Sequence, residues 1–250
     1  MTASAEPPEP AVVRAVPPDT AAWLYDLVHE AEGKDYGREA ALVLQLVGDR
    51  CPRARTLLDV ACGTGRHLEH FARALQCAGV DRDRAMLARA RQRCPGVALT
   101  EADMTDLALG TCFDVVTCLF SAIGYTATVA GLDAAMAAMA AHLRPGGLLV
   151  VEPFLRPEQW VAGFTSLATV RRPEATVARL SVAGRRHDLA LLDFHYLVAS
   201  GGGVEHLVEH HELGLFSWDD HRAALHRAGL EAEVHDEGLT GRGLLVARAP

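Results

Sequence analysis

The sequence predicts an α/β protein in which a seven-stranded, mainly parallel sheet carries an inserted antiparallel β-sheet. Between residues 56 and 152, short apolar runs alternate with helical patterns, which is typical of parallel strands connected by helices. Between residues 157 and 215, apolar and polar residues alternate without a helical pattern, which is typical of antiparallel hairpins. With 250 residues, the chain is long enough to bury a large core.

These patterns divide the chain into three parts. Residues 1–20 are rich in proline, carry little charge and lack the apolar segment of a signal peptide, so we expect a disordered leader there. Residues 21–156 and 216–250 form the predicted α/β domain, and residues 157–215 form the predicted inserted sheet.

Two helices are expected before the first strand of the large sheet. Helical periodicity runs from Trp23 to Val47 and contains two apolar stripes. The stripes are separated by residues 32–37, a break bounded by Gly33 and Gly37. We interpret this break as a loop with a functional role.

The strands and helices of the large sheet then follow in alternation. The predicted strands are residues 56–61, 77–81, 97–102, 113–120 and 148–152, and the predicted helices between them are residues 66–74, 84–93 and 130–143. The run 113–120 is almost continuously apolar, as expected for a strand that is buried on both faces.

The remaining elements complete both sheets. Four strands of the inserted sheet are expected at residues 168–170, 176–182, 190–198 and 204–215, with hairpin loops at 184–186 and 200–203. Ser217 is a favourable N-cap for a helix that ends near Ala228, just before Gly229. A closing hairpin of residues 231–235 and 244–247 supplies the last two strands of the large sheet.

The composition argues against several classes of partner. The formal net charge of −8 disfavours nucleic acid, and no apolar run approaches the roughly 20 residues of a membrane helix. The six cysteines are scattered without a Cys-x-x-Cys pair, which favours a reducing cytoplasm. His206, His210 and His211 are close in sequence, but their segment has the pattern of a strand, so we expect no metal site.

A glycine-containing loop after the first strand is the strongest functional signal. Residues 59–65 read Asp-Val-Ala-Cys-Gly-Thr-Gly between a strand and a helix, the ligand-binding corner of a doubly wound sheet. A dinucleotide loop has a third glycine three residues after Gly65, where this chain has Leu68. The loop therefore suits a nucleoside ligand without a phosphate to bind, such as S-adenosylmethionine.

Acidic residues at the ends of the next strands fit such a ligand. Asp81 lies 22 residues after Asp59, where a carboxylate can accept both ribose hydroxyls, although it could instead cap the next helix. Asp103 and Met104 follow the third strand and could bind the amino group and ring of adenine, or form a solvated turn. Phe120 and Ser121 end the fourth strand, and Glu152 ends the fifth strand at the same crevice.

The chain resembles the class I S-adenosylmethionine-dependent methyltransferases, which have a Rossmann-like seven-stranded sheet. Residues 59–65 match the first motif of that class, and Asp81, Asp103-Met104 and residues 143–147 fall where its later motifs fall.

A narrower resemblance is to the N,N-dimethyltransferases of TDP-linked amino sugars, of the desosamine and mycaminose type. It rests on residues 25–29, 33–36, 67–71, 120–125, 151–153 and 241–244.

The resemblance implies a role for each matched residue. The residues expected to bind S-adenosylmethionine or close over it are Tyr25, Tyr36, Asp59, Ala61, Gly63, Asp81, Asp103, Met104 and Phe120. Tyr125 and Glu152 are expected to be catalytic, at the reacting amine. The residues expected to bind the substrate are Tyr25, Ser121, Glu152 and Arg242, of which Arg242 reaches the diphosphate. The inserted sheet is expected to contact substrate or to form a homodimer.

We therefore predict a cytoplasmic N-methyltransferase that transfers one or two methyl groups to the amine of a TDP-linked deoxyamino sugar in natural-product biosynthesis. Two alternatives remain at this stage. One is a methyltransferase for another small amine or hydroxyl. The other is a non-catalytic S-adenosylmethionine-binding protein, which would have no need of Tyr125, Glu152 and Arg242 around the crevice.

Overall fold

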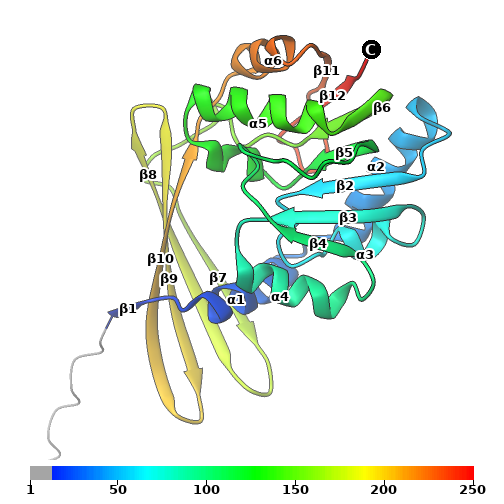
Figure 1. Ribbon diagram of the computed structural model, residues 1–250. Coiled ribbons are helices and arrows are strands. Elements are labelled where there is room, and N and C mark those ends of the chain that lie inside the picture. The colour runs from blue at the N-terminus through cyan, green and yellow to red at the C-terminus, as the bar shows by residue number, and fades with distance from the viewer. Residues whose placement is uncertain (1–12) are drawn as a thin grey trace, which may run out of the picture.

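Seven strands form the larger sheet, in the order β11-β12-β6-β5-β2-β3-β4 (Figure 1). The structure is a computed structural model and describes residues 13–250. Strands β2 to β6 are parallel, and β12 runs antiparallel to β6 and pairs with β11. The strands are β2 (Thr56–Val60), β3 (Gln76–Asp81), β4 (Ala98–Glu101), β5 (Phe113–Cys118), β6 (Leu143–Val151), β11 (Glu231–His235) and β12 (Leu244–Arg248). This confirms the predicted seven-stranded sheet.

The strand order places a ligand-binding crevice at the centre of the sheet. From β2 the chain moves outward through β3 to β4, and it then returns to place β5 on the other side of β2. The connections after β2 and after β5 therefore diverge above the carboxyl ends of these two strands. In open α/β sheets, ligands bind at such a reversal of strand order.

Helices cover both faces of the large sheet. On one face, Leu58 and Val60 pack against α5 (Val129–Ala141) and α6 (Trp218–Arg227). On the other, Leu57 packs against α2 (Tyr36–Arg50), because neighbouring residues of a strand point to opposite faces. The shorter helices are α3 (Leu68–Phe71), α4 (Arg84–Arg93) and the 3₁₀ helix η1 (Ala122–Thr126). No helix within residues 13–250 is long and apolar enough to cross a bilayer.

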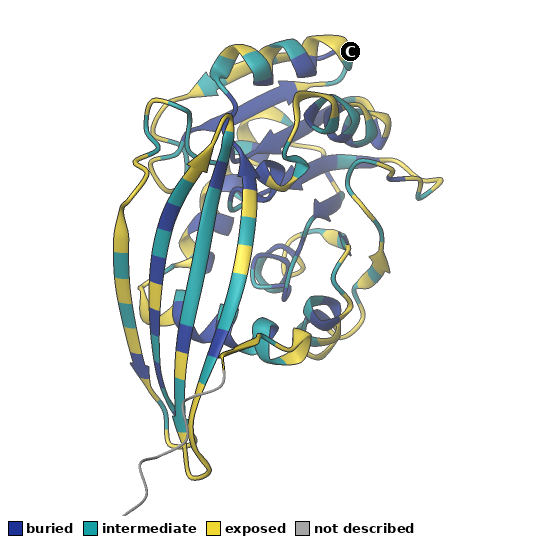
Figure 2. Cartoon of the chain, turned by 90° about the vertical axis from the view of Figure 1, so that its left-hand side faces the viewer, coloured by how far each residue is buried: buried dark blue, intermediate teal, exposed yellow. Residues whose placement is uncertain are grey.

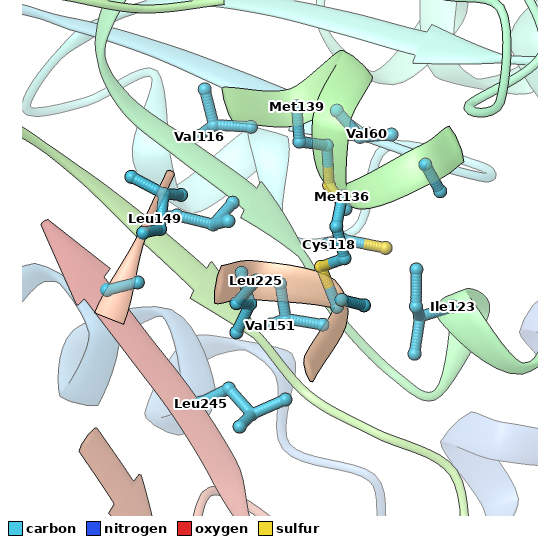
Figure 3. Packing of buried hydrophobic residues seen from close by; sticks show 14 of the residues in the cluster. Val60, Val116, Cys118, Ile123, Met136, Met139, Leu149, Val151, Leu225 and Leu245 are labelled. Atoms are coloured by element: carbon cyan, nitrogen blue, oxygen red, sulfur yellow. The ribbon is translucent and has the colours of Figure 1, made fainter. Parts of the chain in front are cut away.

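The largest apolar cluster lies between the sheet, α5 and α6 (Figure 3). In α5, four fully buried side chains recur at helical spacing: Leu132, Ala135, Met136 and Met139. They contact strand residues that include Val116, Leu149 and Val151. This packing holds the carboxyl ends of β5 and β6 in fixed positions beneath the crevice.

The second sheet has the strand order β1-β10-β9-β8-β7, and Figure 2 shows it in front of the large sheet. Its strands are β1 (Val13–Ala15), β7 (Thr165–Arg171), β8 (Thr176–Arg186), β9 (Leu189–Ser200) and β10 (Gly203–Gly214). The strands from β7 to β10 are antiparallel, as predicted for the inserted segment. The first strand, β1, adds to the edge of β10 in the parallel direction.

Helix α1 (Pro18–Ala31) joins the two sheets. Its apolar residues Leu24, Leu27 and Val28 pack on the inner face of the second sheet. On its other side, the buried Asp26 carboxylate accepts hydrogen bonds from the Thr64 hydroxyl, at 2.6 Å, and from Arg93 on α4, at 2.7 Å. The helix is therefore fastened to the glycine loop, and it fixes the second sheet over the crevice.

Three sequence predictions need correction. The disordered leader, predicted for residues 1–20, is wrong for residues 13–20, because β1 pairs with β10 and Pro18 begins α1; residues 1–12 lie outside the described part of the chain. The helix predicted for residues 66–74 is the single turn α3. The strand predicted for residues 113–120 ends at Cys118, because Phe120 and Ser121 adopt left-handed backbone conformations.

Candidate functional site

A single large cavity lies above the carboxyl ends of β2, β3, β4 and β5, between the large sheet and the inner face of the second sheet. Its volume is about 1110 Å³. Pockets for a drug-sized ligand measure about 300–1,000 Å³, so this cavity has room for two ligands side by side. One end is lined by the glycine loop, and the other end is lined by side chains of β8, β9 and β10.

The glycine loop makes a tight turn at the floor of the cavity. Ala61, Gly63 and Gly65 have φ values of 56°, 55° and 77°, in the left-handed region that favours glycine. A Cβ atom on Gly65 would lie 3.2 Å from Ala90 Cβ, so glycine lets α4 pack closely on the loop. Leu68, at the position of a dinucleotide loop's third glycine, is fully buried and packs beside Gly79.

Asp81 lies at the end of β3 and organises this loop. Its Oδ2 accepts a hydrogen bond from the Gly63 N–H at 2.7 Å, and its Oδ1 accepts one from the Asp83 N–H at 2.9 Å. Burial raises the pKa of the Asp81 carboxyl, and the two N–H groups oppose that shift. A carboxylate has about four lone-pair sites, so Asp81 can also accept a pair of ribose hydroxyls from the cavity.

The predicted adenine-binding residues lie at the next strand end. Ala102, Asp103 and Met104 all line the cavity after β4. Asp103 Oδ1 accepts hydrogen bonds from the N–H and the hydroxyl of Thr105, which lower the pKa of its carboxyl. Its Oδ2 stays available for a donor in the cavity, and Met104 supplies an apolar surface next to it. The N-cap of α4 is Asp83, so Asp81 does not have the capping role that was its alternative.

Asp59 is a buried carboxyl beneath the loop. It lies at the cavity floor in β2, is 2% exposed, and accepts a hydrogen bond from the Thr117 hydroxyl at 2.7 Å. Burial raises the pKa of Asp59 to about 6, although His67 and Thr117 oppose the shift. Ionising this group in the folded protein therefore costs free energy.

Replacing Asp59 by asparagine is expected to stabilise the folded protein at neutral pH. The folded-state pKa of about 6 lies above the ordinary value of 3.8, so the protonated carboxyl favours the folded state. The unfolding free energy of the wild type therefore falls as the pH rises through about 6. At about 1.4 kcal/mol per pKa unit, the gain in unfolding free energy is roughly 2–3 kcal/mol above pH 7 and vanishes below about pH 4. Urea unfolding of the wild type and Asp59→Asn at several pH values measures it.

Asp114→Asn is the matched control for this prediction. Asp114 lies near the amino end of β5. Burial raises the pKa of its carboxyl, but hydrogen bonds from Arg55 and Thr56 outweigh burial, so the pKa lies below its ordinary value. Its replacement should therefore destabilise the protein at neutral pH and lose its effect in acid. A stability gap between Asp59→Asn and the wild type that does not change with pH would contradict the assignment.

Phe120 is the centre of an aromatic and cationic cluster at the mouth of β5. Its ring makes edge contacts with Tyr25 and Tyr36, at centroid distances of 6.2 and 6.4 Å. The Lys34 ammonium lies 3.6 Å from the ring centroid, and the Arg242 guanidinium carbon lies 5.3 Å from it. The predicted loop at residues 32–37 is shorter than expected, because α2 already begins at Tyr36, and its residues 32–35 supply Lys34 to this cluster.

Glu152 supports this cluster from below. It is fully buried, and its two oxygens accept hydrogen bonds from the Phe120 N–H, at 2.7 Å, and from the Thr240 hydroxyl. It lies behind Phe120 and is absent from the described residues that line the cavity. The structure therefore does not place Glu152 at a reacting amine, and we assign it the role of holding Phe120 and the loop around residue 240.

Ser121 and Arg242 meet on the cavity wall although they are 121 residues apart. An Arg242 guanidinium N–H donates to the Ser121 hydroxyl at 3.2 Å, and this hydroxyl donates to the Pro153 carbonyl at 3.1 Å. Gly241 and Gly243, on either side of Arg242, have φ values of 82° and 96°. The remaining N–H groups of the guanidinium are free to bind an anionic ligand in the cavity.

Tyr125 connects the two walls of the cavity. It lies in η1, and its hydroxyl is 2.9 Å from Nδ1 of His211, a residue of β10 in the second sheet. Burial raises the pKa of Tyr125 above its ordinary value. The phenol therefore stays protonated at neutral pH and acts as a hydrogen-bonding group.

Sequence reasoning missed the residues that the second sheet contributes to the cavity. They share its inner face and include Arg179, Phe194, Tyr196, Glu209 and His211. A signal for them exists in the strand alternation, because Glu209 and His211 fall on the same face as the buried Leu207. Polar residues are uncommon on the buried face of a strand, so their presence there indicates a ligand-binding site. His206 and His210 lie on the opposite face, beside His195 and Asp193.

Three buried polar atoms on the cavity wall are suited to bind polar ligands. The Tyr36 hydroxyl, Arg179 Nε and His211 Nε2 are buried and have no hydrogen-bond partner among the described residues. Leaving such groups unpaired costs about 1–3 kcal/mol each. All three line the same cavity, so bound ligands can satisfy them. The donor and acceptor set at the loop end fits a nucleoside with an amino-acid tail, as S-adenosylmethionine has.

The chain is similar to known methyltransferases. A family model described as a methyltransferase domain matches residues 57–147. The dTDP-3-amino-3,6-dideoxy-alpha-D-glucopyranose N,N-dimethyltransferase of Streptomyces fradiae is 44% identical over 89% of this chain and 88% of its own length. The dTDP-4-amino-2,3,4,6-tetradeoxy-D-glucose N,N-dimethyltransferase of Saccharopolyspora spinosa is 40% identical, over 89% and 90%.

A solved structure shows a similar fold with the cofactor present. It is an amino pentose methyltransferase from Micromonospora echinaspora, involved in calicheamicin biosynthesis, with S-adenosylmethionine bound. The two structures superpose with a TM-score of 0.85 at 41% identity, over 91% of this chain and 97% of the other.

Proposed function

We propose that this chain, which belongs to the family of dTDP-amino-sugar N,N-dimethyltransferases, transfers methyl groups from S-adenosylmethionine to the amine of a dTDP-linked deoxyamino sugar. One observation carries the proposal. A single cavity extends from Asp81 at the glycine loop to Tyr125 and Arg242 at the second sheet, so both ligands fit in one space. The membership establishes an S-adenosylmethionine-dependent methyltransferase, and the substrate is inferred from the relatives.

At the loop end, we assign the residues that hold S-adenosylmethionine, which supplies a methyl group already activated on a sulfonium. Asp81 accepts the ribose hydroxyls, and Asp103 with Met104 binds the adenine. The buried Tyr36 hydroxyl is unpaired among the described residues and would bind the amino-acid tail of the cofactor. Tyr25 and Phe120 close over the cofactor at the mouth of the cavity.

At the other end, we assign the residues that orient the amino sugar. Arg242 binds the diphosphate, because its guanidinium offers several N–H donors to phosphate oxygens. Ser121 fixes that guanidinium and Tyr125 borders the reacting amine. In-line transfer from an activated donor mainly requires that the nucleophile is positioned and water is excluded. Tyr125 is then the residue in contact with the acceptor, and Glu152 positions Phe120 from behind.

The test is a turnover assay with the purified protein, S-adenosylmethionine and a panel of dTDP-linked 3-amino and 4-amino sugars. We expect products heavier by one and then by two methylene increments, as read by mass spectrometry. The relatives include enzymes for both amine positions, so the panel also identifies the sugar. Turnover of a free amine or a hydroxyl, without turnover of any dTDP-amino sugar, would overturn the substrate.

We also propose that the enzyme works in the cytoplasm. The six cysteines are all unpaired in the structure, including the exposed Cys112, as expected in a reducing compartment. The substrate, a nucleotide-linked sugar, is an intracellular type of metabolite.

We propose that the outer face of the second sheet forms a homodimer interface. Leu167, Leu180 and Leu197 lie on this face and are 66%, 45% and 49% exposed, and Val13 and Val204 add to it at the edge. Contiguous exposed apolar side chains on a flat sheet mark a protein interface. A two-fold dimer uses the same face twice, so each leucine is buried in both copies.

Charging this face is expected to dissociate the dimer. Burying a leucine contributes about 1.5–3 kcal/mol, so Leu180→Asp combined with Leu197→Asp should weaken association at least about 100-fold. Light scattering coupled to size exclusion measures the mass of each variant. Leu42→Asp, on α2 and 39% exposed, is the matched control and should leave the dimer intact. A wild type that is monomeric at all concentrations would contradict the interface.

A further inference from the structure

A chain of three titratable side chains leads from the reacting end of the cavity into the second sheet. The Tyr125 hydroxyl lies 2.9 Å from His211 Nδ1, and His211 Nε2 lies 3.4 Å from Glu209 Oε2. All three residues line the cavity. We propose that Glu209, His211 and Tyr125 form a proton relay that removes the proton from the substrate's ammonium group. The proposal rests on the amino-sugar substrate proposed above.

The geometry assigns a direction to this relay. Glu209 Oε2 lies 3.4 Å from His211 Nε2, an ion-pair distance for a protonated imidazole, although Nε2 makes no hydrogen bond among the described residues. In the proposed relay, Nε2 carries the hydrogen on the side of this carboxylate. Nδ1 is then the acceptor for the Tyr125 hydroxyl. The order of groups, carboxylate to imidazole to hydroxyl, is the one that lets a histidine take a proton and keep it as an ion pair.

The chemistry requires such a group. A primary aliphatic amine is mostly protonated at neutral pH, and the ammonium has no lone pair to attack a methyl group. The N–H proton passes to the Tyr125 oxygen while the Tyr125 hydroxyl proton passes to His211 Nδ1. The nitrogen is left neutral with its lone pair free, and the new imidazolium is stabilised by the Glu209 carboxylate. His211 returns the proton to solvent when the product leaves, and a second round repeats the transfer.

Neighbouring groups fit this role. The Tyr196 hydroxyl of β9 donates to Glu209 Oε2 at 3.3 Å and fixes the carboxylate. The Arg82 guanidinium lies 5.7 Å from the Tyr125 ring centroid, and the Arg179 guanidinium lies 4.8 Å from the ring of Phe194. Burial, and then the charges of Glu209 and Asp81, raise the pKa of Tyr125, and Arg82 only partly opposes them. The phenol therefore relays a proton and does not become a stable anion.

The alternative is that His211 merely holds Tyr125 in place, and pH separates the two roles. His211→Asn keeps a hydrogen-bonding atom near the Nδ1 position but cannot accept the proton. At neutral pH we expect kcat/KM to fall about 100-fold, the usual contribution of a general base. Above the pKa of the substrate amine the substrate arrives neutral, so the variant should approach the wild-type rate within a few-fold.

The experiment is a profile of kcat/KM against pH for the wild type, His211→Asn and Glu209→Gln, with calorimetric cofactor titration as a folding check. His206→Asn, on the outer face of the same strand, is the matched control and should follow the wild type. A loss that is the same at every pH, or no loss at neutral pH, would overturn the relay. If His211→Asn fails to bind the cofactor, Tyr125→Phe removes only one hydroxyl and must show the same pH rescue. Failure of the wild type on every amino sugar would instead reject the proposed substrate.

Discussion

Asp81→Ala is expected to weaken S-adenosylmethionine binding about 100- to 1000-fold. The carboxylate is at the end of β3, mostly buried, and is the acceptor nearest to the glycine loop. Each hydrogen bond between a charged group and a ribose hydroxyl is worth about 1.5–3 kcal/mol, so the loss of two, taken at the lower end of that range, gives roughly 3–4 kcal/mol. The variant also removes the acceptor of the Gly63 N–H, so the glycine loop loses a hydrogen bond that fixes its turn. Isothermal titration calorimetry measures both affinities.

A carboxylate on the neighbouring strand provides the control. Glu101 is paired with Asp81 in the sheet register, but it is exposed and binds Arg84 outside the cavity. Glu101→Ala should therefore leave the affinity unchanged. Asp81→Asn separates the two roles of the residue, because the amide can keep one loop contact while it loses the charge. Equal affinity of the wild type and Asp81→Ala would remove Asp81 from the cofactor site.

Much of the fold could be predicted because its signals are local. The strand at residues 231–235 and the helix at 84–93 agree with the structure residue for residue. The errors arose where tertiary contacts override local pattern. Residues 13–15 are a strand only because β10 offers them an unpaired edge, and no periodicity of three residues can show that. Phe120 leaves the strand because Glu152, distant in sequence, accepts its N–H.

The candidate site divides in the same way. The cofactor end is built from strand ends and one short loop, so Gly63, Asp81 and Asp103 could be located from spacing alone. The acceptor end is built by bringing a second sheet over the first. The alternation of residues in β10 defines two faces, but it does not say which face covers the cavity, so Glu209 and His211 were missed. The role expected of Glu152 at the reacting amine stays a prediction, and in the structure its oxygens bind the Phe120 N–H and the Thr240 hydroxyl.

The family resemblance resolved what the residues alone left open. The alternatives of a different small acceptor or a non-catalytic binding protein were compatible with the glycine loop. Relatives that are 44% and 40% identical over most of the chain narrow the class to the dTDP-amino-sugar enzymes. The contacts that each side chain makes come from the structure and not from the resemblance.

Arg242→Ala is expected to lower kcat/KM for the dTDP-amino sugar about 100-fold, mainly through a higher KM. A bidentate arginine–phosphate contact consists of two charge-assisted hydrogen bonds, and losing them costs roughly 3 kcal/mol. Glycine at position 243 lets the loop pack closely on the Trp218 ring, because a Cβ atom there would lie 2.4 Å from it. Arg242→Lys keeps the charge without the planar fork and should give an intermediate loss. Steady-state kinetics at saturating cofactor measure these values.

The assignment to the diphosphate is tested by removing that group from the substrate. A methyl glycoside of the same amino sugar has no phosphate, so the wild type and Arg242→Ala should turn it over at equally low rates. Arg248→Ala is the matched control, since Arg248 lies on the same terminal hairpin and binds the Gly146 carbonyl away from the cavity. The contrary result would be that Arg242→Ala lowers the turnover of the glycoside by the same factor as the turnover of the dTDP-amino sugar. In that case the guanidinium acts by holding Ser121 and Phe120, and the diphosphate must bind elsewhere in the cavity.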